Sequence, residues 1–256
     1  MLGTPQSEDA AVFSTPDHPT HILGSAVSEC GRFLWLTSTE GCDPRNKLYY
    51  IDLHALAASG APLSAAAAPV VKLVDDFVAS WDPIVVDGTQ LVLQTNLDAP
   101  RYRVVRVDLA DAPSVAAGPS AWRSLVPQQP EAGGWGVLEW AAAAAGDALV
   151  LCYSKDAHHS LQLHSLESGE LVAPVALPSL GSVSGASVKR EDAAIFFGFT
   201  SFLDPGAVYS LDTATPGAKP ALVRRSAVSG FDPDAYECAL WIAHSSLIVY
   251  EPLTRA

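Results

Sequence analysis

The chain has 256 residues, of which 49% are hydrophobic and only 17% charged, and its formal net charge is −13 at pH 7. A surface this acidic repels phosphate groups, which argues against nucleic acid and anionic membranes as partners. Its apolar stretches fall well short of the ~20 residues of a membrane-spanning helix, and its first residues, MLGTPQSED, lack the basic and apolar regions of a secretory signal.

The wide spacing of the four cysteines indicates a reducing cellular compartment. Cys30, Cys42, Cys152 and Cys238 lie far apart and form neither a CxxC pair nor the dense pattern of a disulfide scaffold. Free thiols are typical of reducing environments, so we expect a cytoplasmic protein.

Short apolar segments bounded by turn residues predict strands along most of the chain. Residues 10–16, AAVFSTP, come first, and the later segments fall into groups of four. The first group occupies residues 20–77, with the segments ILGSAVS, FLWLTS, LYYIDL and VVKLVDD. The second occupies residues 78–128, with DPIVVD, QLVLQT, VVRVDL and WRSLVPQ.

The same grouping continues to residue 228. The third group occupies residues 135–178, with VLEWAAA, ALVLCYS, LQLHSL and LVAPVAL. The fourth occupies residues 181–228, with SVSGASV, AIFFGFT, VYSLDT and ALVRRSA. The third segments of successive groups recur about every 50 residues, which is the length of one four-stranded propeller blade. Residues 237–256 do not continue the pattern, and we expect them to form a divergent tail.

The repeat predicts an all-β fold: an incomplete β-propeller of about four blades, open as an arc, with residues 1–19 as the end of a preceding blade. A β-sandwich also has many short strands, but the regular grouping in fours favours the propeller. An α/β fold would need helical patterns of ~10 to 15 residues between strands. The alanine-rich residues 55–68 are interrupted by Gly60 and Pro62, so we interpret them as a surface insertion.

Two sets of side chains have structural interpretations. Large aromatic side chains suit the packing of blade on blade, which we expect for Trp81, Trp122, Trp135 and Trp140. Aspartates recur directly after the third strand of a group, where a carboxylate can accept from neighbouring backbone amides and close the turn; these are Asp52, Asp108 and Asp212.

Eight segments, in the same order and with similar spacing, resemble the propeller of the prolyl oligopeptidase family. Together they extend over roughly residues 2–236. They are LGTPQSED, EGCDPRNKLYYIDL, KLVDDF, TNLDAPRYRVVRVDL, VLEW, LVLCYSKD, LQLHSLESGEL and FTSFLDPG.

The resemblance implies a specific function. In this family a seven-bladed propeller covers an α/β-hydrolase domain, whose Ser, Asp and His triad cleaves short peptides after proline, and the propeller restricts access to that triad. The chain resembles the end of the third blade and the last four blades. We therefore expect the substrate-gating portion of a serine endopeptidase, a fragment without the hydrolase domain and inactive alone. The alternative is a stand-alone propeller that serves as a protein-binding scaffold.

Cys42 is the first candidate site residue. In the family the cysteine of the EGCDP loop lines the substrate pocket, with an arginine three residues before it and a methionine about twenty before it. Those places hold Thr39 and Ile22 here, so the positive charge is lost and the apolar wall changes shape. The competing interpretation of Cys42 is an ordinary thiol in a loop.

The sequence offers no catalytic machinery of its own. A nucleophile elbow needs G-x-S-x-G, and the nearest segment, GASVK at residues 185–189, lacks the last glycine and falls in a predicted strand. His158, His159 and His164 are close in sequence but have no accompanying metal motif, and we expect neither a metal nor another cofactor.

Partners follow from the incomplete ring. Short proline-containing peptides would bind only if a hydrolase domain completes the pocket. Missing blades would leave an apolar face at each end of the arc, which predicts poor solubility or self-association.

Overall fold

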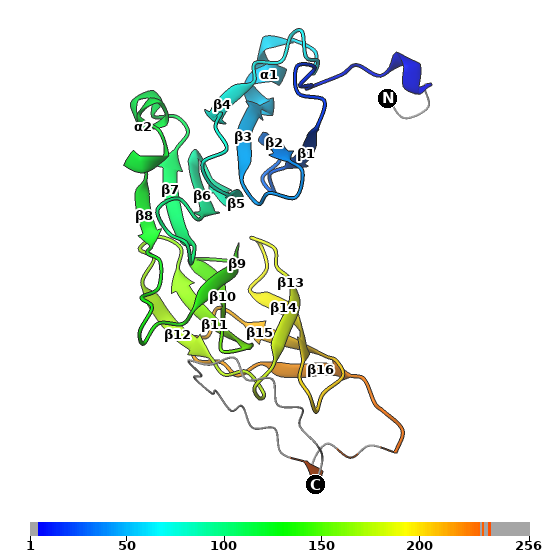
Figure 1. Ribbon diagram of the computed structural model, residues 1–256, viewed down its shortest axis with the longest axis vertical. Helices are drawn as coiled ribbons and strands as arrows, with labels where there is room; N and C mark the ends of the chain where they lie inside the picture. The colour runs from blue at the N-terminus through cyan, green and yellow to red at the C-terminus, as the bar shows by residue number, and fades with distance from the viewer. Residues whose placement is uncertain (1–4, 231, 233–234, 237–256) are drawn as a thin grey trace, which may run out of the picture.

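The computed structural model describes residues 5–230, 232, 235 and 236. Its strands form four antiparallel sheets of four strands each, which follow one another in chain order along an arc (Figure 1). Within every sheet the strands are also adjacent in chain order. This arrangement confirms the partial, unclosed β-propeller, and each sheet is called a blade below. None of the described helices is long and apolar enough to cross a membrane.

The strand bounds are as follows. The first blade contains β1 (His21–Val27), β2 (Phe33–Glu40), β3 (Asn46–Asp52) and β4 (Val71–Val74). The second contains β5 (Trp81–Asp87), β6 (Gln90–Thr95), β7 (Arg103–Asp108) and β8 (Arg123–Val126). The third contains β9 (Val137–Ala143), β10 (Ala148–Lys155), β11 (His158–Ser165) and β12 (Leu171–Val175). The fourth contains β13 (Ser182–Ser187), β14 (Ala194–Thr200), β15 (Ala207–Asp212) and β16 (Ala221–Arg225).

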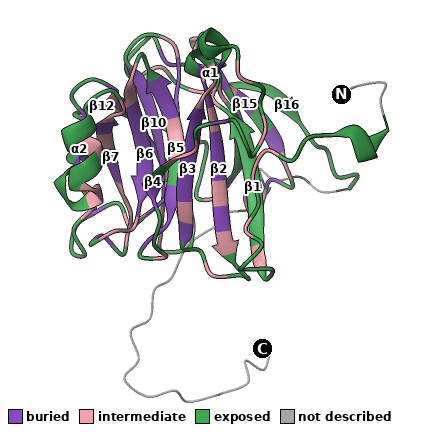
Figure 2. Ribbon diagram, turned by 90° about the horizontal axis from the view of Figure 1, so that it is seen from above, coloured by how far each residue is buried: buried purple, intermediate pink, exposed green. Residues whose placement is uncertain are grey.

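The second strand of an inner blade is buried on both faces because each blade packs between two others. Six consecutive residues of β10, from Ala148 to Tyr153, are buried, which explains why ALVLCY is a continuous apolar run and does not alternate. Alternate side chains of β10 enter different cores: Val150 joins the core with the fourth blade, and Leu151 the core with the second. Figure 2 shows these buried central strands beside the exposed helices.

The tryptophan prediction is correct for three of the four residues. Trp81 and Trp122 lie in the core between the first and second blades, with ring centroids 5.6 Å apart. Trp140 packs against the core between the third and fourth blades. Trp135 contradicts the prediction, since it lies in the linker before β9 and is 40% exposed.

Two short helices differ from the expected plan. α1 (Leu53–Ser59) begins where Asp52 caps the amides of His54 and Ala55, and it ends at Gly60, whose φ is 69°. The alanine-rich insertion is therefore partly helical, although Gly60 does interrupt it. α2 (Ala112–Ala117) was not expected, because a helix of six residues is too short to show a 3.6-residue period. Two 3-10 turns complete the elements, η1 (Gln6–Glu8) and η2 (Pro119–Ala121).

The aspartate prediction is confirmed in three blades. Asp52 accepts from the amides of His54 and Ala55, Asp108 from that of Ala110, and Asp212 from that of Ala214. Ser165 takes the corresponding place in the third blade, where its hydroxyl oxygen accepts from the Ser168 amide.

The two ends of the arc differ. The outer face of the first blade, which carries Tyr49 and Ile51, is covered by Leu56 of α1 and by Val12 and Phe13. The expected strand over residues 10–16 is wrong: this segment pairs with no described strand and contributes its apolar side chains to that cover instead. The outer face of the fourth blade leaves Phe196 44% and Val208 39% exposed.

Candidate functional site

All three predicted site residues lie at one end of the blades. Because the strands are antiparallel, the turn between β2 and β3 lies beside the start of β1, as the pairing of His21 with Glu40 shows. The linkers between blades also reach this end, since Leu48 near the start of β3 pairs with Val74 at the end of β4. We call this end the Cys42 face; it comprises the turns and linkers 41–45, 75–80, 96–102, 127–136, 156–157, 176–181 and 201–206.

Ile22 and Thr39 lie directly opposite each other on neighbouring strands. They are paired in the β1–β2 register, and the Thr39 hydroxyl donates to the Ile22 carbonyl over 3.4 Å. Ile22 is 59% exposed, and Cys42 is exposed in the turn that follows β2. The fold thus brings Ile22 and Thr39 into contact and places Cys42 one turn away at the same end.

The turn that carries Cys42 is held by an ion pair. The Arg45 guanidinium donates to both Asp43 carboxylate oxygens, and the Arg45 amide also donates to Asp43. These hydrogen bonds lower the pKa of Asp43 to about 2. Gly41 begins the turn with a φ of 59°, a conformation that favours glycine. The Cys42 thiol therefore sits on a structured turn.

Exposed apolar side chains also gather on the Cys42 face. Phe202 in the β14–β15 turn is 94% exposed, and the linkers add Val78, Trp135 and Leu180, at 56%, 40% and 41%. Sequence reasoning missed this feature, because it assigned Trp135 to the interior and did not single out the other three. A signal was available in the turn FTSFLDPG, where an aromatic residue stands among turn-forming residues. Apolar groups on one face are typical of a surface that another domain covers.

The histidines have structural contacts. His159 Nδ1 accepts from the Val183 amide over 3.0 Å and so ties the third blade to the fourth. His164 is buried between the Gly169 carbonyl and the Gln162 side chain, at 2.9 and 2.7 Å, and its burial lowers its pKa. The Gln162 atom that contacts His164 Nε2 is its amide oxygen, Oε1.

One serine–histidine contact lies in the first blade, but it is not accessible. His21 Nδ1 lies 3.1 Å from the Ser38 hydroxyl, but Ser38 is completely buried in the first blade. The GASVK segment falls in β13 and in the turn after it, where no nucleophile elbow forms. Within the described ranges, no group of three His, Cys, Asp or Glu residues could hold a metal ion.

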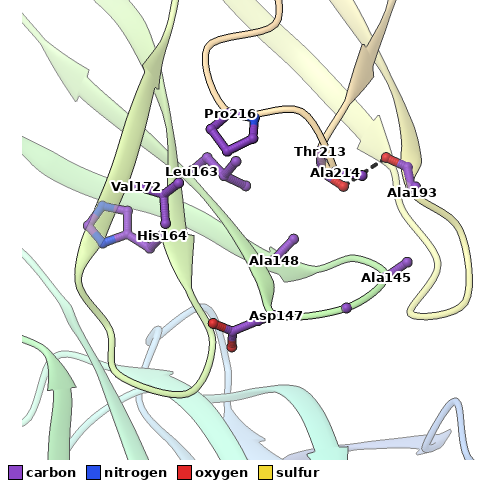
Figure 3. Close-up of a pocket in the computed structure, with 11 residues that line it drawn as sticks. Ala145, Asp147, Ala148, Leu163, His164, Val172, Ala193, Thr213, Ala214 and Pro216 are labelled. Carbon is purple, nitrogen blue, oxygen red and sulfur yellow. Dashed lines mark hydrogen bonds between the residues drawn. The ribbon is translucent and has the colours of Figure 1, made fainter.

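A hollow of about 300 Å³ lies between the third and fourth blades at the end opposite the Cys42 face (Figure 3). Its polar groups are already engaged: the Thr213 hydroxyl donates to the Ala193 carbonyl over 2.7 Å, and His164 is bonded as described. The remaining lining is mostly small and apolar, so the hollow has no group placed for catalysis. It is lined by Ala145, Gly146, Asp147, Ala148, Leu163, His164, Val172, Ala193, Thr213, Ala214 and Pro216.

The family comparison matches nearly the whole chain. The sequence model of the prolyl oligopeptidase N-terminal β-propeller domain matches residues 1–224. A dual-function macrocyclase-peptidase from Galerina marginata is 26% identical over 239 residues, which are 92% of this chain and 30% of the relative. A prolyl endopeptidase from Elizabethkingia meningoseptica is 23% identical over 92% of this chain and 29% of its own length.

The solved structures agree on the fold. Prolyl oligopeptidase B from Galerina marginata without a ligand superimposes with a TM-score of 0.77 at 23% identity, over 92% of this chain and 31% of that structure. A structure from a study of two prolyl endopeptidases gives a TM-score of 0.71 at 32% identity, over 91% and 30%. The chain therefore spans about 30% of the length of the relatives it matches. By this match it belongs to the prolyl oligopeptidase family, of which it is a portion of the N-terminal β-propeller.

Proposed function

We propose that the chain is the substrate-gating part of a serine endopeptidase that cleaves short peptides after proline, and that its Cys42 face covers the hydrolase domain. The observation that carries the proposal is the gathering of exposed apolar side chains, Phe202 above all, at the end that also holds Cys42. At the opposite end the turns 144–147 and 188–193 carry mostly small or charged residues. Although Val27, Leu63 and Leu171 are exposed there, no aromatic side chain of that end in the described residues is as exposed as Phe202.

We assign Cys42, Ile22 and Thr39 to the propeller side of the peptide pocket. Ile22 offers an exposed apolar surface, and Cys42 an exposed thiol. Thr39 has no charge, and its hydroxyl already donates to the backbone of Ile22. These residues would form one wall of a pocket, so a peptide would bind firmly only when the hydrolase domain supplies the others. The chain alone would not hydrolyse peptides.

Cys30 provides a matched control for a test of this face. Like Cys42 it is exposed, but it lies in the β1–β2 turn at the other end of the first blade. We would measure maleimide labelling of both thiols in the full chain, with and without an added hydrolase domain from the Galerina marginata relative. We expect the hydrolase domain to slow labelling of Cys42 and leave that of Cys30 unchanged. Equal effects on the two thiols would refute the proposed orientation.

Activity is tested in the same samples with a fluorogenic peptide that carries proline before the cleaved bond. We expect no turnover by the chain alone. Turnover that co-purifies with the chain through successive columns would contradict the gating-only role.

The alternative of a protein-binding scaffold is favoured by one observation, the exposed Phe196 and Val208 on the outer face of the fourth blade. It would place the partner on that face and leave both thiols labelled at their original rates. A cytoplasmic location stays a prediction; the free state of Cys30, Cys42 and Cys152 is compatible with it, and thiol counting in cell extracts would check it.

A further inference from the structure

One residue of the fourth blade contacts all three of the other blades. Arg190 lies in the turn between β13 and β14, in the fourth blade. Its backbone amide donates to Glu29 Oε1 over 2.8 Å, in the first blade. Its guanidinium donates to the carbonyls of Ala144 and Gly146, in the third blade, over 2.7 and 2.6 Å. The same group lies 3.7 Å from an Asp87 carboxylate oxygen, in the second blade.

The contact with Glu29 is unusual because the first and fourth blades are not neighbours. The three cores between blades join only successive blades: first with second, second with third, third with fourth. The hydrogen bond between Arg190 and Glu29 skips two blades and joins residues 161 positions apart in sequence. Arg190 and each residue that it contacts lie in the turn between the first and second strands of a blade or, for Asp87, at the end of the first strand, so they meet at the end opposite the Cys42 face.

The contacts differ in strength. Hydrogen bonds from a guanidinium to carbonyls, and from an amide to a carboxylate, are charge-assisted and stronger than neutral ones. The Asp87 pairing is long and its carboxylate is 73% exposed, so water and salt screen it. Asp87 and Arg190 line a hollow between the second and third blades, which is separate from the one in Figure 3. Asp147, Glu167 and Arg106 also line it, so other charged groups surround this ion pair. The bonds to the third blade anchor Arg190, and the bond to Glu29 reaches across the arc.

We propose that the turn of Arg190 is a latch that holds the first and fourth blades together at the end of the arc opposite the Cys42 face. Anchored on the third blade, it fixes the position of the β1–β2 turn through Glu29. When this bond opens, the described part of the first blade stays joined to the arc through its core with the second blade and the hydrogen bonds of Asn46 to the linker before β5 and to the first residue of β5, and it can swing outward about that junction. The latch goes beyond the gating role and does not depend on it.

Hydrogen exchange tests the latch directly, because the bonded donor is itself a backbone amide. The full chain would be compared as wild type, Glu29→Ala, Glu29→Gln and Glu191→Ala, the last a neighbouring exposed carboxylate as control. We expect Glu29→Ala to speed exchange in residues 188–193 by about tenfold and to raise the radius of gyration in small-angle scattering. Glu29→Gln keeps an acceptor oxygen and should give an intermediate effect, and Glu191→Ala none.

Exchange in residues 188–193 that is equally fast in Glu29→Ala and Glu191→Ala, with circular dichroism unchanged, would overturn the latch. If Glu29→Ala fails to fold, Glu29→Gln decides: faster exchange than in wild type supports the latch, and identical exchange rejects it.

Discussion

Asn46 and His159 make the same contact in two different blades. Each stands near the start of the third strand, and each donates its backbone amide to the linker before the next blade, to Ala79 and Gly181 respectively. Each side chain then accepts from the amide two residues later, that of Trp81 at 2.7 Å or Val183 at 3.0 Å. Asn46 adds a bond to the Trp81 carbonyl at 3.1 Å. The side chains thus extend the hydrogen bonding of one blade to the next.

This equivalence predicts the effect of substitution at His159. His159→Ala leaves the Val183 amide without its acceptor and should lower the free energy of unfolding by about 1–2 kcal/mol. His159→Asn should retain most of that stability, because asparagine already makes the contact in the first blade. Urea denaturation followed by tryptophan fluorescence measures both. Similar losses for the two variants would show that the imidazole, and not the accepted hydrogen bond, stabilises this junction.

Trp81 and Trp135 should respond very differently to truncation. Trp81 is 1% exposed in the core between the first and second blades, so Trp81→Ala should lower the unfolding free energy by about 3–5 kcal/mol. Trp135 is 40% exposed in a linker, and Trp135→Ala should change it by less than about 0.5 kcal/mol. The same denaturation experiment tests both, and a large loss at Trp135 would contradict its exposed position.

The stability that the Asp75 carboxylate gives to the first blade should depend on pH. Burial raises the pKa of this carboxyl, but hydrogen bonds from Lys72, Tyr49 and Lys47 outweigh burial and lower it from 3.8 to about 2. Because the folded pKa lies below the unfolded one, the ionised carboxylate stabilises the fold at neutral pH. This contribution is present above pH ~4 and is lost as the pH falls toward 2.

The variant Asp75→Asn isolates that contribution. We expect it to be less stable than wild type at pH 7 and to lose less stability between pH 5 and pH 2, as measured by urea denaturation at each pH. Glu191→Gln, outside this hydrogen-bond network, serves as the control. Parallel pH profiles for wild type and Asp75→Asn would rule out the carboxylate as the source.

We expect the chain to associate with a second copy of itself through the outer face of the fourth blade. Phe196 and Val208 lie on this face and are partly exposed, so burial against a second molecule would remove apolar surface from water. Phe196→Ser should shift the chain toward monomer in size-exclusion chromatography with light scattering. Phe202→Ser, on the Cys42 face, is the comparison and should leave the distribution unchanged. A wild-type chain that stays monomeric at high concentration would contradict this prediction.

The strands and their grouping could be predicted because their signals are local. Alternating or continuous apolar segments, turn residues between them and a recurrence of about 50 residues all depend on neighbours in sequence. The aspartates after the third strands were predicted for the same reason: a carboxylate two residues from an amide needs no distant partner. Ile22 and Thr39 could be named from the family resemblance, and the β1–β2 register then placed them opposite each other.

The sequence by itself therefore determined an all-β chain of repeated four-stranded blades and its family. Tertiary structure decided which apolar residues are buried and which bonds join the blades. Trp135 is as apolar as Trp81, and only the packing of blade on blade leaves one in a linker and buries the other. Likewise, nothing near Arg190 in sequence indicates Glu29, because that contact exists only after the intervening blades have curved the chain into an arc.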